Sequence, residues 1–319
     1  MPKIGLMPRC YLNDIAAGRM DLFAWLDDAA CLEPEGHELH AAFFQGKSGG
    51  YVDRARCHAE SLGTPVVSLC YAPDFTQPDP AARAAEVRGQ QAAIRLAARL
   101  GAGLCRTLSG QRREGLDVDQ AVGWVAECIE QSLPVAEECG VKLVIENHYK
   151  DAFWAYPEFA QRAEVFLRIV ERVHSPHFGV QFDPSNAILA GDDPIALLQA
   201  VKGRLVSMHA SDRFLEPGAS LDDLRQADGT LGYSPKLRHG EIGKGLNDYH
   251  AIFTILREIR YGGWITVENG DTMESMRNSI RFLKGMRAKY FGSSVFGDPD
   301  VAGGGERGTG AVAPPRTSP

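Results

Sequence analysis

The chain has 319 residues, of which 44% are hydrophobic, and its formal net charge is −7 at pH 7. An acidic chain without a strongly basic run disfavours nucleic acid as a partner, because phosphate-binding surfaces are built from clustered Lys and Arg. No apolar run approaches the roughly 18 residues that span a bilayer, and seven cysteines without a Cys-x-x-Cys spacing are typical of a reducing compartment, so we expect a cytoplasmic protein without a membrane partner.

Short strand-like runs alternate with helical patterns eight times along the chain. The strands are expected at 3–7, 38–44, 65–71, 103–109, 142–147, 178–183, 204–210 and 264–269. The helices that follow them are expected near 21–31, 52–62, 79–100, 119–139, 158–173, 193–201, 247–259 and 273–290. This alternation indicates parallel β-α-β units, and eight of them are the number that closes a (β/α)8 TIM barrel. An open doubly wound sheet is disfavoured, because the turn after the first strand, MPRCYLND, has no glycine to form a phosphate loop.

Two segments depart from the regular alternation. Residues 211–246, between the seventh strand and its helix, are far longer than a usual strand–helix loop and are expected to form a lid or a binding segment. Residues 292–319 are rich in Gly, Pro and Ser and are expected to be a disordered tail. We therefore expect a single TIM-barrel domain over residues 1–291.

Four successive strands end in a side chain that can bind a metal ion: Glu146, Asp183, His209 and Glu268. Active sites of TIM barrels lie at the C-terminal ends of the strands, so these four should converge. Three carboxylates brought together would raise one another's pKa unless a cation neutralised them. Oxygen ligands with one imidazole favour Mn²⁺, with Mg²⁺, Co²⁺ or Zn²⁺ as alternatives. The sequence therefore predicts one divalent metal ion.

The segments around these side chains carry a resemblance to a known family. LVIENH, FGVQFDPSN, LVSMHASDR and GEIGKGLNDYHAIFTILREIRYGGWITVEN resemble the xylose-isomerase-like sugar isomerases and epimerases, over about residues 3–290. The resemblance implies that the four residues are metal ligands, that Arg213 contacts substrate oxygens, and that Glu146 and Glu268 transfer the proton. The implied function is removal of a proton from the carbon next to a sugar carbonyl, with the metal stabilising the enediolate.

Further candidates lie near the strand ends. His148 is two residues beyond Glu146 and should face the same side of the extended chain, so it is a second candidate base. Arg106 and His239 are candidates for substrate binding. Trp154 and Tyr156 could form an apolar wall over the sugar. The other histidines are expected to be structural and to lie away from the mouth: 37, 40, 58, 174, 177 and 250.

A second resemblance concerns the run ENHYKDAFWAYPEFAQ, which is similar to the catalytic subunits of C-glycoside deglycosidases. It implies a lyase that acts on glycosides already oxidised at carbon 3, removing the proton next to the 3-oxo group and then expelling the aglycone. Those enzymes work with a small partner subunit, so such a subunit or a homo-oligomer is an open alternative here. The substrate is then either a small carbonyl sugar or a 3-oxo-glycoside.

The sequence disfavours two other classes of function. Apurinic/apyrimidinic endonucleases of the same fold need three metal ions and additional histidines, whereas this chain has Asn186 three residues after Asp183 and Leu237-Arg238-His239 in the long loop. The fourth strand offers Arg106 and Ser109 and no histidine, so a trinuclear site cannot be assembled. A non-catalytic sugar-binding barrel has no support, because all four predicted ligands are present.

Overall fold

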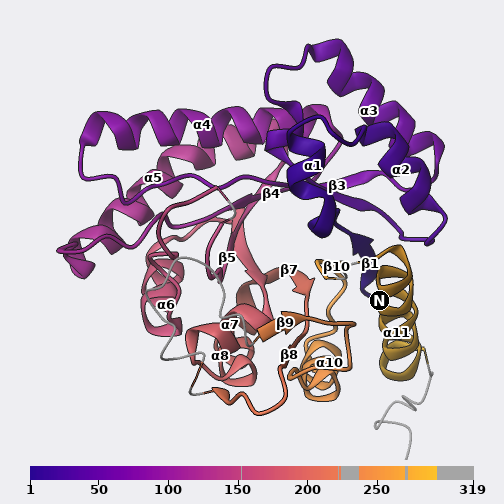
Figure 1. Ribbon diagram of the computed structural model, residues 1–319. Helices are drawn as coiled ribbons and strands as arrows, with labels where there is room; N and C mark the ends of the chain where they lie inside the picture. Colours follow the sequence, from indigo (N-terminus) through magenta and orange to yellow (C-terminus); the bar gives the residue numbers. More distant parts are fainter. Residues whose placement is uncertain (152, 222, 224–236, 270–271, 293–319) are drawn as a thin grey trace, which may run out of the picture.

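The computed structural model describes residues 1–151, 153–221, 223, 237–269 and 272–292 (Figure 1). Eight parallel strands close into a barrel in the order β1-β10-β7-β6-β5-β4-β3-β2, which confirms the predicted TIM barrel. The strands are β1 (Lys3–Leu6), β2 (His37–His40), β3 (Val66–Cys70), β4 (Leu104–Thr107), β5 (Lys142–Glu146), β6 (Phe178–Phe182), β7 (Leu205–Ala210) and β10 (Trp264–Val267). Most strand residues are buried, as expected for a parallel sheet covered on both faces.

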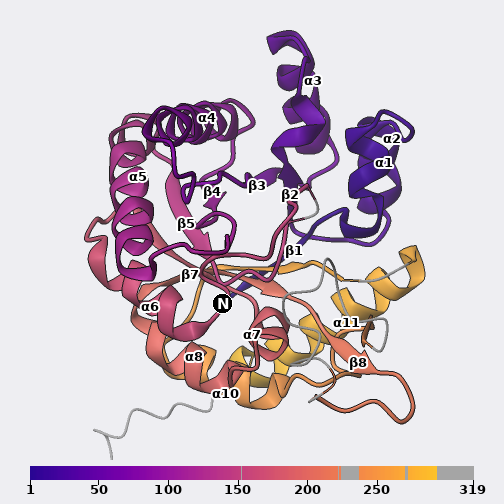
Figure 2. The same cartoon turned by 60° about the vertical axis from the view of Figure 1, so that its left-hand side comes forward.

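One long helix follows each barrel strand and packs on the outside of the barrel, where α4, α5, α6, α8 and α10 succeed one another around it (Figure 2). The eight helices are α2 (Leu22–Ala30), α3 (Gly49–Ser61), α4 (Pro80–Arg99), α5 (Val118–Cys139), α6 (Ala163–Arg172), α8 (Pro194–Val201), α10 (Tyr249–Glu258) and α11 (Met273–Phe291). Several of them begin at an Asp whose carboxylate accepts backbone N–H groups of the first turn, as Asp79 and Asp193 do. Among the described residues, no helix combines the length and the apolar character needed to cross a membrane.

The described chain also has short elements that the strand–helix pattern did not predict. They are η1 (Arg9–Tyr11), α1 (Leu12–Ala16), η2 (Ala41–Phe44), α7 (Pro184–Ala190), η3 (Lys202–Arg204) and the antiparallel pair β8 (Arg213–Leu215) and β9 (Leu237–His239). Both strands of the β8–β9 pair lie within the predicted 211–246 loop. Residues 222 and 224–236, which are most of the segment between these two strands, and the predicted tail beyond Gly292 lie outside the described residues. The domain division at 291 therefore stays a prediction.

Two predicted boundaries were wrong for a physical reason. The second strand ends at His40 rather than at 44, because Nδ1 of His40 accepts the backbone N–H of Ala42 and thereby starts a 3-10 turn. The helix predicted from 158 begins only at Ala163, because the carboxylate of Glu158 is turned inward to bind Ser109. The first error displaced His40, which lines a pocket at the mouth of the barrel, and the second displaced the buried Glu158.

Candidate metal centre and active site

Glu146, Asp183, His209 and Glu268 meet at one point of the barrel mouth. They come from the ends of the neighbouring strands β5, β6, β7 and β10, and each offers a ligand atom within 4.8 Å of the others. Nδ1 of His209 lies 3.0 Å from an oxygen of Glu146 and 3.0 Å from an oxygen of Glu268. The cluster therefore presents three carboxylates and one imidazole to a single point.

The electrostatics of this cluster fit a bound cation. Burial, followed by repulsion from Glu268 and Glu146, raises the pKa of Asp183 to about 7. Burial disfavours charge on His209, but the carboxylates of Glu268, Glu38 and Glu146 outweigh it and raise the pKa of the imidazole well above its usual value. The raised pKa values mean that Asp183 and His209 take up protons, which offset the negative charge of the crowded carboxylates. A bound cation would offset the same charge. A divalent ion held by these four side chains fits the donor set.

The ligands are fixed from behind by further hydrogen bonds. Asp183 caps α7, and its Oδ1 accepts the backbone N–H of Ser185 at 2.7 Å and the hydroxyl of Ser211 at 2.7 Å. Nε2 of His209 lies 3.1 Å from Oε1 of the buried Glu38, which leaves Nδ1 on the ligand side. A carboxylate behind an imidazole ligand fixes its tautomer and orientation. Glu38 was missed by the sequence analysis, although a charged residue inside an otherwise buried strand, HELH, is an available signal.

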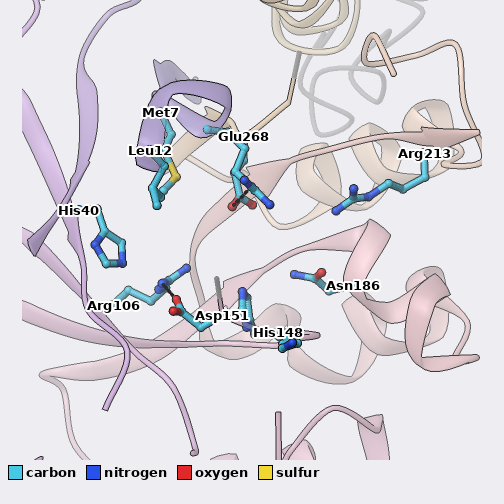
Figure 3. A pocket seen from close by; sticks show the side chains of 11 residues that line it. Met7, Leu12, His40, Arg106, His148, Asp151, Asn186, Arg213 and Glu268 are labelled. Atoms are coloured by element: carbon cyan, nitrogen blue, oxygen red, sulfur yellow. Dashed lines mark ion pairs between the residues drawn. The ribbon is translucent and has the colours of Figure 1, made fainter. Parts of the chain in front are cut away.

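A pocket opens above the cluster, and its side chains point inward from several strand ends (Figure 3). It is lined by Met7, Arg9, Leu12, His40, Arg106, His148, Lys150, Asp151, Asn186, Arg213 and Glu268. Four cationic side chains are in this set, so the pocket suits a ligand rich in hydroxyl and carbonyl oxygens. We call this space the metal pocket.

The two glutamates of the cluster have different surroundings. Oε2 of Glu146 receives the guanidinium of Arg106 at 2.8 Å, and its Oε1 receives the amide of Asn186 at 3.2 Å as well as His209. Glu268 has a side chain that is 12% exposed, lines the metal pocket and lies 3.8 Å from Arg9. Protein groups therefore contact both oxygens of Glu146, which does not line the pocket. Glu268 is also contacted by His209, but it faces the space where a substrate would bind.

His148 lines the same pocket, with a buried carboxylate behind it. Its Nδ1 lies 3.6 Å from Oε2 of Glu158. Burial opposes charge on the ring, but Glu146 and Glu158 outweigh it and raise the pKa of His148. Burial raises the pKa of Glu158. His148 is thus a pocket-lining imidazole whose Nδ1 faces a buried carboxylate.

Arg213 lines the metal pocket, whereas His239 is not among the lining residues. His239 instead contacts Arg213 through Nε2 and the amide of Asn269 through Nδ1 at 3.0 Å. Burial and the neighbouring Arg213 lower the pKa of His239 to about 3, so the ring is neutral. The structure therefore places His239 behind Arg213, and not at the surface of the pocket.

His40 was expected to lie away from the mouth, and this was wrong. It is the last residue of β2 and lines the metal pocket beside Arg106 and Asp151 (Figure 3). Burial, the largest cause, lowers its pKa to about 4. Once the strand end is set at position 40, the rule that located the metal ligands would have found His40. Arg9 and Asp151 were also missed, because Arg9 lies in the 3-10 helix η1 and Asp151 in the loop after β5, and neither residue is at a strand end.

An apolar groove adjoins the metal pocket and shares His40 and Asp151 with it. Its other walls come from η2, the face of α4 and the loop after β5. The apolar lining residues include Phe44, Tyr71, Ala92, Ala93, Leu96, Phe153 and Trp154. Trp154 thus lies in the groove, beside the metal pocket, whereas Tyr156 is 50% exposed and is not part of the groove lining.

A family profile described as "Xylose isomerase-like TIM barrel" matches residues 28–286. The chain belongs to this family. Two curated relatives match shorter segments: an inosose dehydratase from Clostridium beijerinckii is 25% identical over 137 residues, 42% of this chain and 42% of that protein. An uncharacterized protein from Methanocaldococcus jannaschii is 24% identical over 154 residues, 47% of this chain and 44% of that protein. The chain therefore spans less than half the length of these relatives.

Solved structures of sugar epimerases share the fold. D-psicose 3-epimerase from Clostridium cellulolyticum, solved with D-tagatose, superposes with a TM-score of 0.68 at 15% identity, covering 89% of this chain and 98% of that chain. The 3-keto-D-glucoside 4-epimerase from E. coli superposes with a TM-score of 0.64 at 15% identity, covering 89% and 100%. At these identities the likeness establishes the fold alone.

Proposed function

We propose that this protein is a divalent-metal-dependent enzyme that removes a proton from the carbon next to the carbonyl group of a sugar. The observation that carries the proposal is the convergence of four ligand atoms within 4.8 Å beneath a pocket lined by cationic side chains. The sugar epimerases that share the fold support a sugar as substrate. Mn²⁺ is the favoured ion, because three of four ligands are carboxylates.

Glu146, Asp183, His209 and Glu268 would hold the ion, which when bound would polarise the sugar carbonyl and its neighbouring hydroxyl. Arg213 and Arg9 line the pocket and would bind and orient substrate oxygens. Glu268 and His148 both line the pocket, so they are our proton-transfer groups. Glu146, whose oxygens are occupied by Arg106, Asn186 and His209, is better suited to the ligand role alone.

A second candidate function is a lyase that cleaves 3-oxo-C-glycosides, and the apolar groove favours it. A base would take the proton from carbon 2, next to the 3-oxo group. The bond between carbon 1 and the aglycone would then break, and the aglycone carbon would take up a proton as it leaves. The groove adjoins the metal pocket through His40 and Asp151, so a flat aglycone on a bound sugar could extend into it. The name of the E. coli neighbour, a 3-keto-D-glucoside epimerase, is in keeping with an oxidised glycoside.

The proposal is tested by incubating the Mn²⁺-loaded protein in D₂O with D-fructose, with methyl 3-oxo-glucoside and with an aryl 3-oxo-C-glucoside, in separate reactions. Mass spectrometry would detect deuterium at the carbon next to the carbonyl, and liquid chromatography would detect epimers or a released aglycone. We expect deuterium uptake with at least one probe and metal content of one ion per chain. No uptake with any probe, or two to three ions per chain, would refute the proposal and reopen a phosphodiesterase.

A further inference from the structure

Glu158 is a buried acid that the proposed function does not use. It lies between β5 and α6, where it pairs with Gln111 in an isolated antiparallel bridge, and it is 0% exposed. Its Oε1 accepts the backbone N–H of Ser109 at 2.7 Å and also the hydroxyl of Ser109. One oxygen of the carboxylate is therefore anchored to the loop after β4, which fixes the direction of the other.

The second oxygen, Oε2, faces Nδ1 of His148 at 3.6 Å. Within the described part of the chain, neither of these two buried atoms has a hydrogen-bond partner. Leaving both polar atoms buried without a hydrogen bond is costly, and a small rotation of the ring would join them. Contacts between catalytic groups are often long in the absence of substrate and shorten when it binds.

We propose that Glu158 is a positioning residue that holds His148 with its proton on Nδ1 and with Nε2 unprotonated toward the metal pocket. This inference rests on the proposed function and deepens it, because it assigns the proton acceptor. The substrate C–H proton would pass to Nε2, and the electron pair of that bond would stay in the substrate as an enolate. The imidazolium formed would face the Glu158 carboxylate, which stays ionised.

The contrast with Glu146 supports this assignment. Arg106, Asn186 and His209 contact the two oxygens of Glu146, and the remaining acceptor capacity of this carboxylate is assigned to the metal ion. His148 lines the pocket and, through Glu158, has its other nitrogen directed away from the substrate. Of the two side chains at the end of β5, His148 is therefore the one whose surroundings leave an acceptor available.

The first test does not require turnover. In the Glu158→Gln variant, the amide oxygen should take the place of Oε1, because Ser109 offers it two donors. The amide NH₂ would then point at Nδ1 and move the proton of the neutral ring to Nε2. Nitrogen-15 NMR of histidine-labelled, Mg²⁺-loaded protein at alkaline pH would show this, with the His148 signal assigned by its loss in His148→Ala. An unchanged tautomer in Glu158→Gln would overturn the inference.

The second test uses the deuterium-uptake assay with the wild type's best probe. We expect Glu158→Gln to lower kcat by at least ~100-fold with KM and metal content unchanged, as for other carboxylates that orient a catalytic imidazole. Adding Glu158→Gln to His148→Ala should have no further effect, whereas a purely structural role would be equally harmful in both backgrounds. Glu164→Gln, an exposed acid on α6, is the matched control. If the wild type takes up no deuterium, the proposed function fails, and the tautomer measurement still decides the role of Glu158.

Discussion

The mouth of the barrel is built differently on its two sides. On one side, the neighbouring strands β5, β6, β7 and β10 end in the four predicted metal ligands, which are held by buried hydrogen bonds from behind. On the other side, β1–β4 and their loops contribute Arg9, His40 and Arg106 to the pocket and also form most of the apolar groove. We infer that the first side sets the chemistry and the second side sets which molecules are acted on.

The largest effect is expected from a ligand that also faces the substrate. Glu268→Gln removes a carboxylate from the metal cluster and a proton-transfer group from the pocket, so turnover should fall by at least ~1,000-fold. The measurement is deuterium uptake with the wild type's best probe, using Glu274→Gln, an exposed acid in the first turn of α11, as control. Retention of more than about a tenth of the wild-type rate, equivalent to about 1.4 kcal/mol of barrier, would remove Glu268 from the mechanism.

A smaller effect is expected from changing Glu38, which contacts the metal ligand His209 from the side away from the metal. Glu38→Gln keeps the shape of the side chain but removes the negative charge next to Nε2 of His209, so affinity for Mn²⁺ should fall by about 10–100-fold. Competition with a chelator measures this, and His209→Ala sets the expected upper limit of the loss. Cys70→Ser is the matched control, since a hydroxyl can still donate to Glu38. Equal affinity of Glu38→Gln and the wild type would show that the contact does not support the metal.

The residues of the two sides of the barrel mouth could be predicted from the sequence to different extents. The rule that side chains at the C-terminal ends of parallel strands converge was sufficient to bring Glu146, Asp183, His209 and Glu268 together. It requires only correct strand ends, and those of β5, β6, β7 and β10 were placed within about a residue or two.

The rule failed where a local contact overrides the pattern. His40 was not predicted as a site residue, because the strand was expected to continue to position 44. The ring of His40 ends β2 by accepting the backbone N–H of Ala42, and strand propensities do not encode this contact. Glu158 stands twelve positions after Glu146 and reaches the site only because its loop folds back onto Ser109. Glu38 was hidden inside a buried strand. Such residues depend on tertiary contacts, so sequence spacing alone could not assign them.

The metal-ligand side should also respond to pH. In the metal-free protein, Asp183 has a pKa raised to about 7, and the pKa of His209 is raised well above its usual value, so both carry protons at pH 6. A metal ion must displace these protons, so Mn²⁺ affinity should fall as the pH drops through 7. One group of this pKa alone predicts about tenfold weaker binding at pH 6 than at pH 8. Calorimetry in two buffers of different ionisation enthalpy would count the released protons, and equal affinity at the two pH values would contradict the assigned ligands.

The smallest expected effect tests the second side and concerns the size of the substrate. Trp154 lines the apolar groove and not the metal pocket, so a free ketose held by the metal ligands should not need it. A planar aglycone in the groove would bury apolar area against the indole, worth ~25 cal/mol per Å². Trp154→Ala should therefore raise KM for an aryl 3-oxo-glucoside by about five- to tenfold, leaving kcat and the KM for methyl 3-oxo-glucoside nearly unchanged.

Tyr156→Ala is the matched control for this change, because Tyr156 lies on the same loop but is 50% exposed and is not among the groove-lining residues. An aryl-specific loss in Trp154→Ala, absent from Tyr156→Ala, would assign the groove to the aglycone and favour the lyase over the plain epimerase. Equal losses on aryl and methyl substrates would mean that Trp154 acts on the sugar or on the fold of its loop. If only free ketoses react, the groove has no role in catalysis and the function is that of an epimerase. A lyase must bind a substrate that carries the aglycone, and a free ketose has none.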